Sequence, residues 1–196
     1  MNDGSTPLAA EWPLIQGVLS GDPAALDTWY RSEHPLVWRL ALGVLLRAEE
    51  AEDLAQEAML KLHDKLDRWD PKRPYKQWRN TLVLNLCRDR LRRTGARERA
   101  ESAAAQDALQ QPLPDPSQQL EQIELRRLLG MALGQLSARE REAFVLRELE
   151  GNSSEHVAEV MGIEVSSMRS LLTLARRRMR EFLGVRALEF MGEDHV

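Results

Sequence analysis

Apolar residues recur along this chain at intervals of three and four positions, which is the period of an α-helix with one buried face. Alternation with period two is almost absent, and no Asn-Gly or Asp-Gly pair joins two apolar runs as in a β-hairpin. The pattern therefore predicts an all-α protein.

Glycine and proline divide the first half of the chain into predicted helices. Gly21 ends the first helix, and Asp22-Pro23 supplies an N-cap and a first-turn proline for the second. Pro35 is expected to restart the chain for a third helix, and Thr94-Gly95 to end the fifth. The predicted helices cover residues 14–19, 23–30, 36–47, 51–66 and 77–93.

Two of these helices have a clear apolar stripe. In the helix over 51–66 the predicted stripe consists of Leu54, Ala58, Leu62 and Leu66. If this stripe is buried, the acidic and amide side chains of the helix face solvent. In the helix over 77–93 the predicted stripe consists of Trp78, Leu82, Leu86 and Leu91.

The composition changes abruptly at residue 101. Residues 101–124 contain no lysine or arginine, include three prolines and are rich in Gln, Ala and Ser, which is typical of an acidic, partly extended linker. We therefore predict two small helical domains joined by a flexible linker. The predicted domains cover 8–95 and 120–184, with the linker over 96–119 and a short tail over 185–196.

Residues 153–183 fit a helix-turn-helix. Ala158 is small where two helices would cross, and Gly162 falls in the turn. The second helix has a predicted buried stripe of Met168, Leu172, Ala175 and Met179. A generic helical hairpin is the alternative, since small residues and turn glycines also occur in bundles.

Charge adds a functional hint to this helical pattern. The chain has a formal net charge of -4, yet residues 71–100 hold ten basic and two acidic residues, a local charge of +8. Trp69, Tyr75 and Trp78 lie among these cations, as on a surface that follows a phosphate backbone and stacks bases. A solvated helix face is the alternative. Residues 165–180 add five arginines without an acid, which suits the phosphate-lined major groove.

Composition argues against several other classes of function. A single cysteine, Cys87, cannot form an internal disulfide, and the four histidines never occur at the i, i+4 spacing of a helical metal site. Phosphate-loop and hydrolase motifs are missing, so we expect no catalysis, no cofactor and no metal. The first residues do not resemble a secretion signal and no run of eighteen apolar residues exists, so we expect a cytoplasmic protein that does not insert into a membrane.

Two long segments have a distinctive sequence. The first includes VWRLALGVLLRAEEAEDLAQEAMLKLHDKLDRWDP with the later Trp78, Asn85 and Asp89, and the second includes FVLRELEGNSSEHVAEVMGI. Together, in this order around a linker, they resemble the sigma-70 family of transcription initiation factors, in its extracytoplasmic-function (ECF) class. The resemblance covers roughly residues 15–183. It implies a promoter-specificity subunit of RNA polymerase that serves a regulon of stress or envelope-type promoters, and its implied partners are core RNA polymerase, promoter DNA and an anti-sigma factor.

The resemblance also assigns three sets of residues. The acidic helix would dock on the clamp helices of the polymerase through Glu52, Asp53, Gln56 and Glu57. The following loop and basic helix would capture the melted minus-ten element through Lys72, Arg73, Tyr75, Lys76, Trp78, Asn85, Arg88, Arg92 and Arg93. The second helix of the helix-turn-helix would read the minus-thirty-five duplex through Ser166, Ser167, Arg169, Ser170, Thr173, Arg176 and Arg177.

The chain also departs from the family pattern. Leu84, Leu171 and Leu174 stand where relatives usually have basic residues, so we expect weaker attraction to DNA phosphates. Leu171 and Leu174 belong either to a patch for a protein partner or to a helix that is rotated from the predicted orientation. Pro74 stands where a small flexible residue is common, which predicts a different shape for the base-capturing loop.

Two other functions compete with this interpretation. A stand-alone helix-turn-helix regulator would bind DNA without polymerase, but it leaves the first domain without a role. A carboxylate-dependent metal enzyme on a helical scaffold would use the acids between Glu49 and Glu57.

Overall fold

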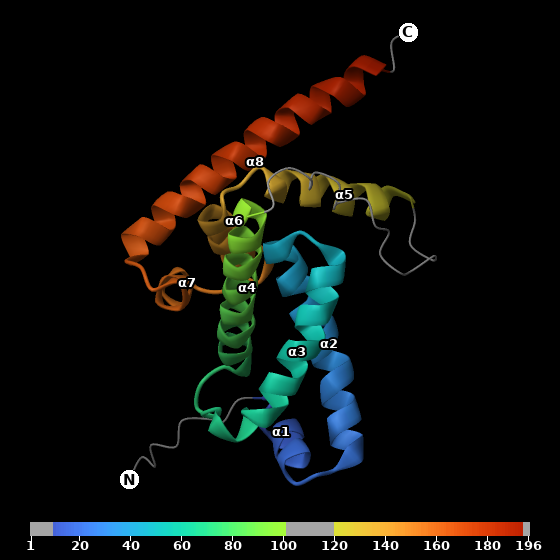
Figure 1. Cartoon of the computed structure of the whole chain (residues 1–196), viewed down its shortest axis with the longest axis vertical. Helices are drawn as coiled ribbons and strands as arrows, with labels where there is room; N and C mark the ends of the chain where they lie inside the picture. The colour runs from blue at the N-terminus through green and yellow to red at the C-terminus, as the bar shows by residue number, and fades with distance from the viewer. Residues whose placement is uncertain (1–9, 101–119, 194–196) are drawn as a thin grey trace. The chain divides into compact units, whose positions relative to one another are not determined.

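The computed structural model describes residues 10–100 and 120–193, with backbone alone for 94–100, 120–124, 126 and 185–193. Every regular element in the described ranges is a helix, which confirms the all-α fold (Figure 1). The helices form two compact units, α1 to α4 and α5 to α8. Most of the predicted linker, residues 101–119, lies outside the described ranges. No described helix is both long and apolar enough to cross a lipid bilayer.

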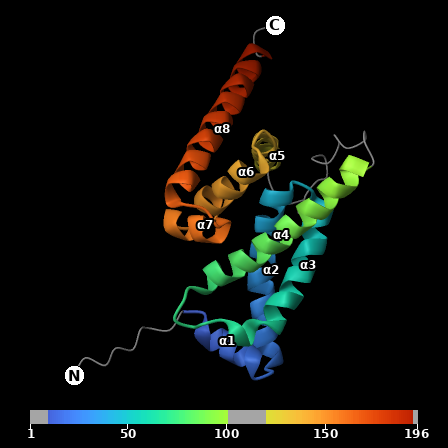
Figure 2. The same cartoon turned by 60° about the vertical axis from the view of Figure 1, so that its left-hand side comes forward.

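The first unit is a helical bundle whose core lies between three long helices. Both views place α2, α3 and α4 together, with the short α1 at one end (Figures 1 and 2). The stripe predicted for the acidic helix is buried as expected, from Leu54 to Leu66. The elements are α1 (Trp12–Leu19), α2 (Pro23–Leu45), α3 (Ala48–Asp64), the 3-10 turn η1 (Leu66–Arg68) and α4 (Tyr75–Ala100).

The turn between α1 and α2 depends on two glycines. Gly21 has φ +80°, in the left-handed region that glycine adopts without a steric cost. A Cβ on Gly17 would lie 2.6 Å from the Cβ of Ala25, so only glycine lets α1 approach α2 this closely. Asp22 accepts a hydrogen bond from the backbone N–H of Ala24 at 3.0 Å, as predicted for a helix N-cap.

The prediction that Pro35 restarts the chain is wrong, because α2 runs through it without a break. The ring of Pro35 is exposed, so water can reach the carbonyl that loses its helical hydrogen bond. On the opposite side of α2, Trp29, Val37 and Val44 are all buried. This continuous buried face outweighs the local preference for a break.

The basic helix α4 differs from the prediction at both ends and in its buried face. It begins at Tyr75, after Pro74 accepts the first helical hydrogen bond from Gln77 at 3.1 Å, and it continues through Gly95 to Ala100. The predicted stripe from Trp78 to Leu91 is only half-buried. The residues that are buried are Tyr75, Arg79, Asn80, Val83, Leu84 and Cys87.

Leu84 therefore does not replace a surface cation. Its side chain is 0% exposed, beside Val83 and Cys87 in the core. A phosphate cannot reach this position, so a leucine here does not remove a phosphate contact from the surface. The basic surface of α4 is correspondingly less weakened than the sequence suggested.

The second unit contains the predicted helix-turn-helix. Ser137 and Glu140 form a capping box at the start of α6, and Gly162 ends α7 with φ +62°. The helix after the turn continues well beyond residue 184, into the segment predicted as a tail. The elements are α5 (Leu120–Gly134), α6 (Ala138–Phe144), the π-helical turn η2 (Val145–Leu149), α7 (Ser154–Met161) and α8 (Val165–Glu193).

Candidate functional site

The predicted docking residues form one face of α3, but they are not equally free. Asp53 and Gln56 are exposed, whereas Glu52 and Glu57 are partly buried. Glu52 accepts a hydrogen bond from Gln56 at 3.3 Å and lies 3.5 Å from His34 on α2. A basic partner would therefore meet Asp53 and Gln56 first.

Glu57 is also an internal bridge. It accepts a hydrogen bond from Lys61 at 2.6 Å and lies 3.6 Å from Arg90, which belongs to α4. The hydrogen bond from Lys61, together with the positive charges of Lys61 and Arg90, lowers the pKa of Glu57 despite its partial burial. One carboxylate of the acidic face thus already lies between two cations, one of them on the basic helix α4.

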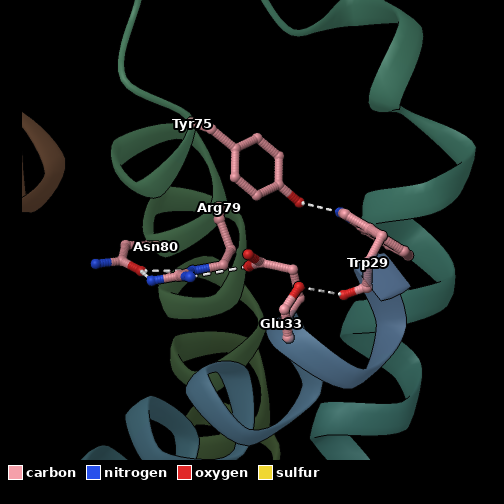
Figure 3. Close-up of polar contacts among 6 residues, drawn as sticks. Trp29, Glu33, Tyr75, Arg79 and Asn80 are labelled. Carbon is pink, nitrogen blue, oxygen red and sulfur yellow. Dashed lines mark hydrogen bonds and ion pairs between the residues drawn. The ribbon is translucent and has the colours of Figure 1, made fainter. Parts of the chain in front are cut away.

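A buried polar cluster joins α2 to the start of α4 (Figure 3). The indole N–H of Trp29 donates to the Tyr75 hydroxyl at 3.0 Å. One turn further along each helix, Arg79 donates to Glu33 at 2.8 Å and to the side-chain oxygen of Asn80 at 3.0 and 3.1 Å. These two contacts lie one helical turn apart on both helices, so together they fix the rotation of α4 about its axis and its position along α2.

Sequence reasoning missed this cluster, although one signal was present. Glu33 lies four residues from both Trp29 and Val37, in the middle of an apolar stripe. A carboxylate at such a position is buried and requires a partner. The partner, Arg79, lies 46 residues away, within the segment predicted to form a basic surface.

Tyr75 does not present a stacking surface for a base. Its ring is 1% exposed, and burial raises the pKa of its hydroxyl well above the ordinary tyrosine value. The ring packs edge-on against Trp69 at 5.3 Å and lies 5.7 Å from Trp78. Among the three rings proposed for stacking, Trp69 is also buried, and Trp78 is half-buried.

The loop before α4 is tied down by three hydrogen bonds. The Trp69 indole donates to the carbonyl of Arg73 at 3.1 Å, and the backbone N–H groups of Lys72 and Arg73 donate to Asp70 at 3.0 and 2.9 Å. The exposed side chains of Lys72 and Arg73 project from this turn. The aromatic residues therefore shape the loop from below, while its cations face outward.

The remaining predicted minus-ten residues lie along α4. Asn85, Arg92 and Arg93 are exposed, whereas Lys76 and Arg88 are half-buried. Arg88 donates to Asn85 at 3.3 Å, and Arg92 pairs with Asp89. Arg97 and Arg99, which contribute to the charge of +8, have side chains outside the described ones.

The second unit presents all seven predicted minus-thirty-five residues on the exposed side of α8. The predicted stripe from Met168 to Met179 is buried, so α8 has the rotation that the sequence predicted. In the unbound chain, the hydroxyls of Ser170 and Thr173 donate to backbone carbonyls four residues back at 3.0 and 2.9 Å.

Carboxylates accompany the arginines of α8. The Arg169 and Arg176 guanidinium groups lie 3.8 Å and 2.6 Å from Glu155 and Glu148. Arg177 lies 3.6 Å from Glu181 along the same helix. The local charge of +5 is therefore partly neutralised before any DNA arrives.

Arg178 differs from the other arginines because its partner is buried. It lies 3.0 Å from Glu140, whose side chain is 4% exposed and which also caps α6. This ion pair joins α8 to α6, so the Arg178 charge already stabilises the packing of the two helices. Among the described residues, no group of three or more His, Cys, Asp or Glu side chains could hold a metal ion.

Comparison with protein families identifies both units. Residues 29–97 match the model of Sigma-70 region 2, and residues 126–179 match the model of Sigma-70, region 4. The two matches fall in the first and second structural units respectively.

Individual proteins agree with the family models. The ECF RNA polymerase sigma factor SigM of Mycobacterium tuberculosis is 30% identical over 171 residues, which cover 87% of this chain and 83% of SigM. SigE of Mycolicibacterium smegmatis is 28% identical over 173 residues, with coverage of 87% and 67%. Sigma factor RpoE of Bartonella quintana, solved with the anti-sigma factor NepR, superposes with a TM-score of 0.67 at 25% identity and covers 81% of this chain and 96% of RpoE.

Proposed function

The chain belongs to the ECF class of sigma-70-type factors, and from that membership we propose how its surfaces divide the work of directing RNA polymerase to promoters. As a sigma factor it is a non-enzymatic polymerase subunit that acts in promoter recognition. The roles assigned below to individual surfaces belong to the proposal, as do its place of action in the cytoplasm and a regulon of stress or envelope-type promoters.

The exposed face of α3 docks on core polymerase. Support comes from the exposure of Asp53 and Gln56 on a helix whose opposite face is buried. Glu52 lies beside them and extends the negative surface, while Glu57 contributes less because Lys61 and Arg90 already hold it. Charged interfaces of this kind steer association and fix its register.

The loop before α4 and the exposed side of α4 hold the melted minus-ten strand. Lys72, Arg73, Arg92 and Arg93 are exposed cations that can follow a single-stranded backbone. Tyr75 contributes by supporting the loop and the half-buried Trp78 from below. The contacts Trp29–Tyr75 and Glu33–Arg79 hold this surface against the rest of the unit.

The exposed side of α8 reads the minus-thirty-five duplex. Ser166, Ser167 and Ser170 lie in its first turns, the part of a recognition helix that contacts base edges. Arg169 and Arg176 lie further round the helix, where phosphates can replace the carboxylates of Glu155 and Glu148. An anti-sigma factor is proposed as a regulator, because RpoE of Bartonella quintana was solved with one.

The docking assignment is tested by measuring affinity for purified core polymerase. The Glu52→Lys/Asp53→Lys variant should lose at least tenfold in affinity while its helical content by circular dichroism stays the same. The matched control is Glu11→Lys/Asp27→Lys, which makes the same charge change at two exposed acids outside α3. Unchanged affinity in the first variant, or an equal loss in the control, would count against docking through this face.

A further inference from the structure

The outward side of α8 has two unlike flanks. With about 100° per residue, Ser170 and Arg177 lie roughly opposite the buried stripe. One flank next to them holds Arg169, Thr173 and Arg176. The other flank holds a ridge at helical spacing that consists of Ser167, Leu171, Leu174 and Arg178.

The ridge from Ser167 to Arg178 offers no mobile cation. Its only charged member, Arg178, is held by the buried carboxylate of Glu140 at 3.0 Å. On the opposite flank, Arg169 and Arg176 have exposed side chains and exposed or partly exposed partners, which a phosphate can replace. The arginine flank thus suits the DNA backbone, whereas the leucine ridge does not.

Leu174 is the exposed apolar member of the ridge. It is 38% exposed and lies roughly 130° from the centre of the buried stripe, so it points toward the side that faces away from the unit. Leu171, three residues earlier, is half-buried. A single exposed leucine on a protein surface needs no explanation. Here, however, the leucine stands among the serines, threonine and arginines of a recognition face.

The buried stripe from Met168 to Met179 shows that α8 is not rotated away from its expected orientation. Leu174, in the third turn of α8, therefore faces the groove if the side bearing Ser170 and Arg177 does. Inside a major groove, the apolar group that bases offer is the C5-methyl of thymine. An apolar contact there contributes sequence preference, while contacts to phosphate position the protein without reading sequence.

We propose that Leu174, with Leu171 beside it, contacts a thymine methyl group in the minus-thirty-five element and selects thymine at that position. The proposal rests on the proposed reading of duplex DNA by α8. Burying one methyl group contributes ~0.8 kcal/mol, which corresponds to about a fourfold preference for thymine over the same base without its methyl group.

Deoxyuridine isolates this contact, because it differs from thymidine only by lacking the methyl group. The holoenzyme, assembled from this chain and core polymerase, first selects promoters from a library that is randomised over the upstream element. Each thymine of the selected element is then replaced in turn by deoxyuridine, and promoter affinity is measured by competition. The measurement is repeated with Leu174→Ala and with the matched control Leu183→Ala, a leucine of the same helix that is 37% exposed.

The proposal predicts that a thymine is selected at one position of the upstream element and that replacing it by deoxyuridine weakens promoter binding about fourfold. Leu174→Ala should abolish this difference, whereas Leu183→Ala should keep it. Circular dichroism checks that both variants remain folded. A difference that persists in Leu174→Ala overturns the proposal, because another group then contacts the methyl. Upstream-dependent transcription without any effect of deoxyuridine also overturns it, but leaves the proposed function intact. Absence of promoter-dependent transcription from the wild-type holoenzyme overturns both.

Discussion

The two basic helices of the chain, α4 and α8, hold their arginines in different surroundings. In α4, Arg79 is 3% exposed and paired with Glu33, and Arg90 lies 3.6 Å from the Glu57 carboxylate. In α8, Arg169 and Arg176 pair with carboxylates at the surface. Part of the charge of α4 is therefore used to position that helix, whereas most of the charge of α8 stays accessible behind replaceable partners.

This contrast shows that a local charge count overstates the charge available to a ligand, for two separate reasons. Burial removes a cation from the surface permanently, because an unpaired charge in the interior is strongly unfavourable. A surface ion pair removes a cation only until a stronger anion arrives, because such pairs contribute little free energy. The following experiments separate the two cases.

The largest effect is expected from Glu33→Leu, which removes the buried carboxylate that pairs with Arg79. Removing one partner of a buried pair costs about 3–5 kcal/mol, so the first unit should lose stability by that amount. Denaturant unfolding followed by tryptophan fluorescence reports on this unit selectively, because all five tryptophans lie between Trp12 and Trp78.

Two companion variants make that measurement specific. Glu33→Leu/Arg79→Met should recover most of the lost stability, because neither charge remains buried. Asp27→Ala removes the partner of Arg31 in an exposed pair, with side chains 62% and 78% exposed, and should cost less than about 1 kcal/mol. Equal losses for Glu33→Leu and Asp27→Ala would show that the buried pair does not position α4.

The loop cations should affect strand opening without affecting duplex binding. Lys72→Ala/Arg73→Ala removes two exposed charges, so we expect the salt dependence of open-complex formation to fall by about 1.4 units of slope, at ~0.7 per single-strand phosphate contact. Permanganate reactivity of unpaired thymines in the minus-ten region measures opening. Arg31→Ala, an exposed cation elsewhere in the first unit, is the control. A slope that does not change would remove these residues from the strand-binding surface.

A smaller effect of opposite sign is expected when a carboxylate beside α8 is neutralised. Glu148→Gln frees Arg176 from its ion pair and should raise affinity for the upstream duplex by up to about fivefold, since surface pairs contribute about 0.2–1 kcal/mol. Arg176→Ala should lower affinity and reduce the salt slope by about one unit. Binding of holoenzyme to upstream duplex at several salt concentrations measures both. If Glu148→Gln weakens binding, the pair does not mask a DNA contact.

The smallest effect concerns His156, whose pKa is lowered mainly by burial in the second unit. Below the ordinary histidine pKa of 6.5, the unfolded chain binds a proton at His156 that the folded chain does not. The contribution of neutral His156 to the free energy of unfolding is therefore fully present above pH 6.5 and is lost as the pH falls below it. Hydrogen exchange of α7 and α8 peptides at pH 7.5 and 5.5 measures this loss. His156→Gln should reduce the pH dependence, and an unchanged dependence would show that other groups cause it.

The sequence was most informative where structure depends on neighbouring residues. The buried stripe of α8, the turn at Gly162 and the stripe of α3 follow from spacing along one helix, and all were predicted correctly. The seven residues of α8 predicted to read the minus-thirty-five element are exposed for the same reason, because they occupy the positions that the stripe leaves.

Predictions failed where contacts between distant residues decide the outcome. The face that α4 buries depends on Glu33 and Trp29, which lie 46 residues before their partners Arg79 and Tyr75. Periodicity ranked Trp78 as core and Arg79 as surface, since it weighs each residue by its own polarity. The continuation of α2 through Pro35 has the same origin, because packing along the helix offsets a local cost.

Reconstituted transcription tests the central claim most directly, namely that one unit docks on polymerase through its acidic face and holds opened DNA through its basic helix. The chain and core polymerase are combined on promoters selected from a random library, and RNA is measured for wild type, Glu52→Lys/Asp53→Lys and Lys72→Ala/Arg73→Ala. The account predicts promoter-specific RNA only when core polymerase and the wild-type chain are combined. The first variant should make little RNA because it no longer binds core polymerase. The second should make little RNA because it binds core polymerase normally but opens the promoter DNA poorly. Tight, sequence-specific binding of duplex DNA by the chain alone, with no promoter-specific RNA when core is added, would contradict it.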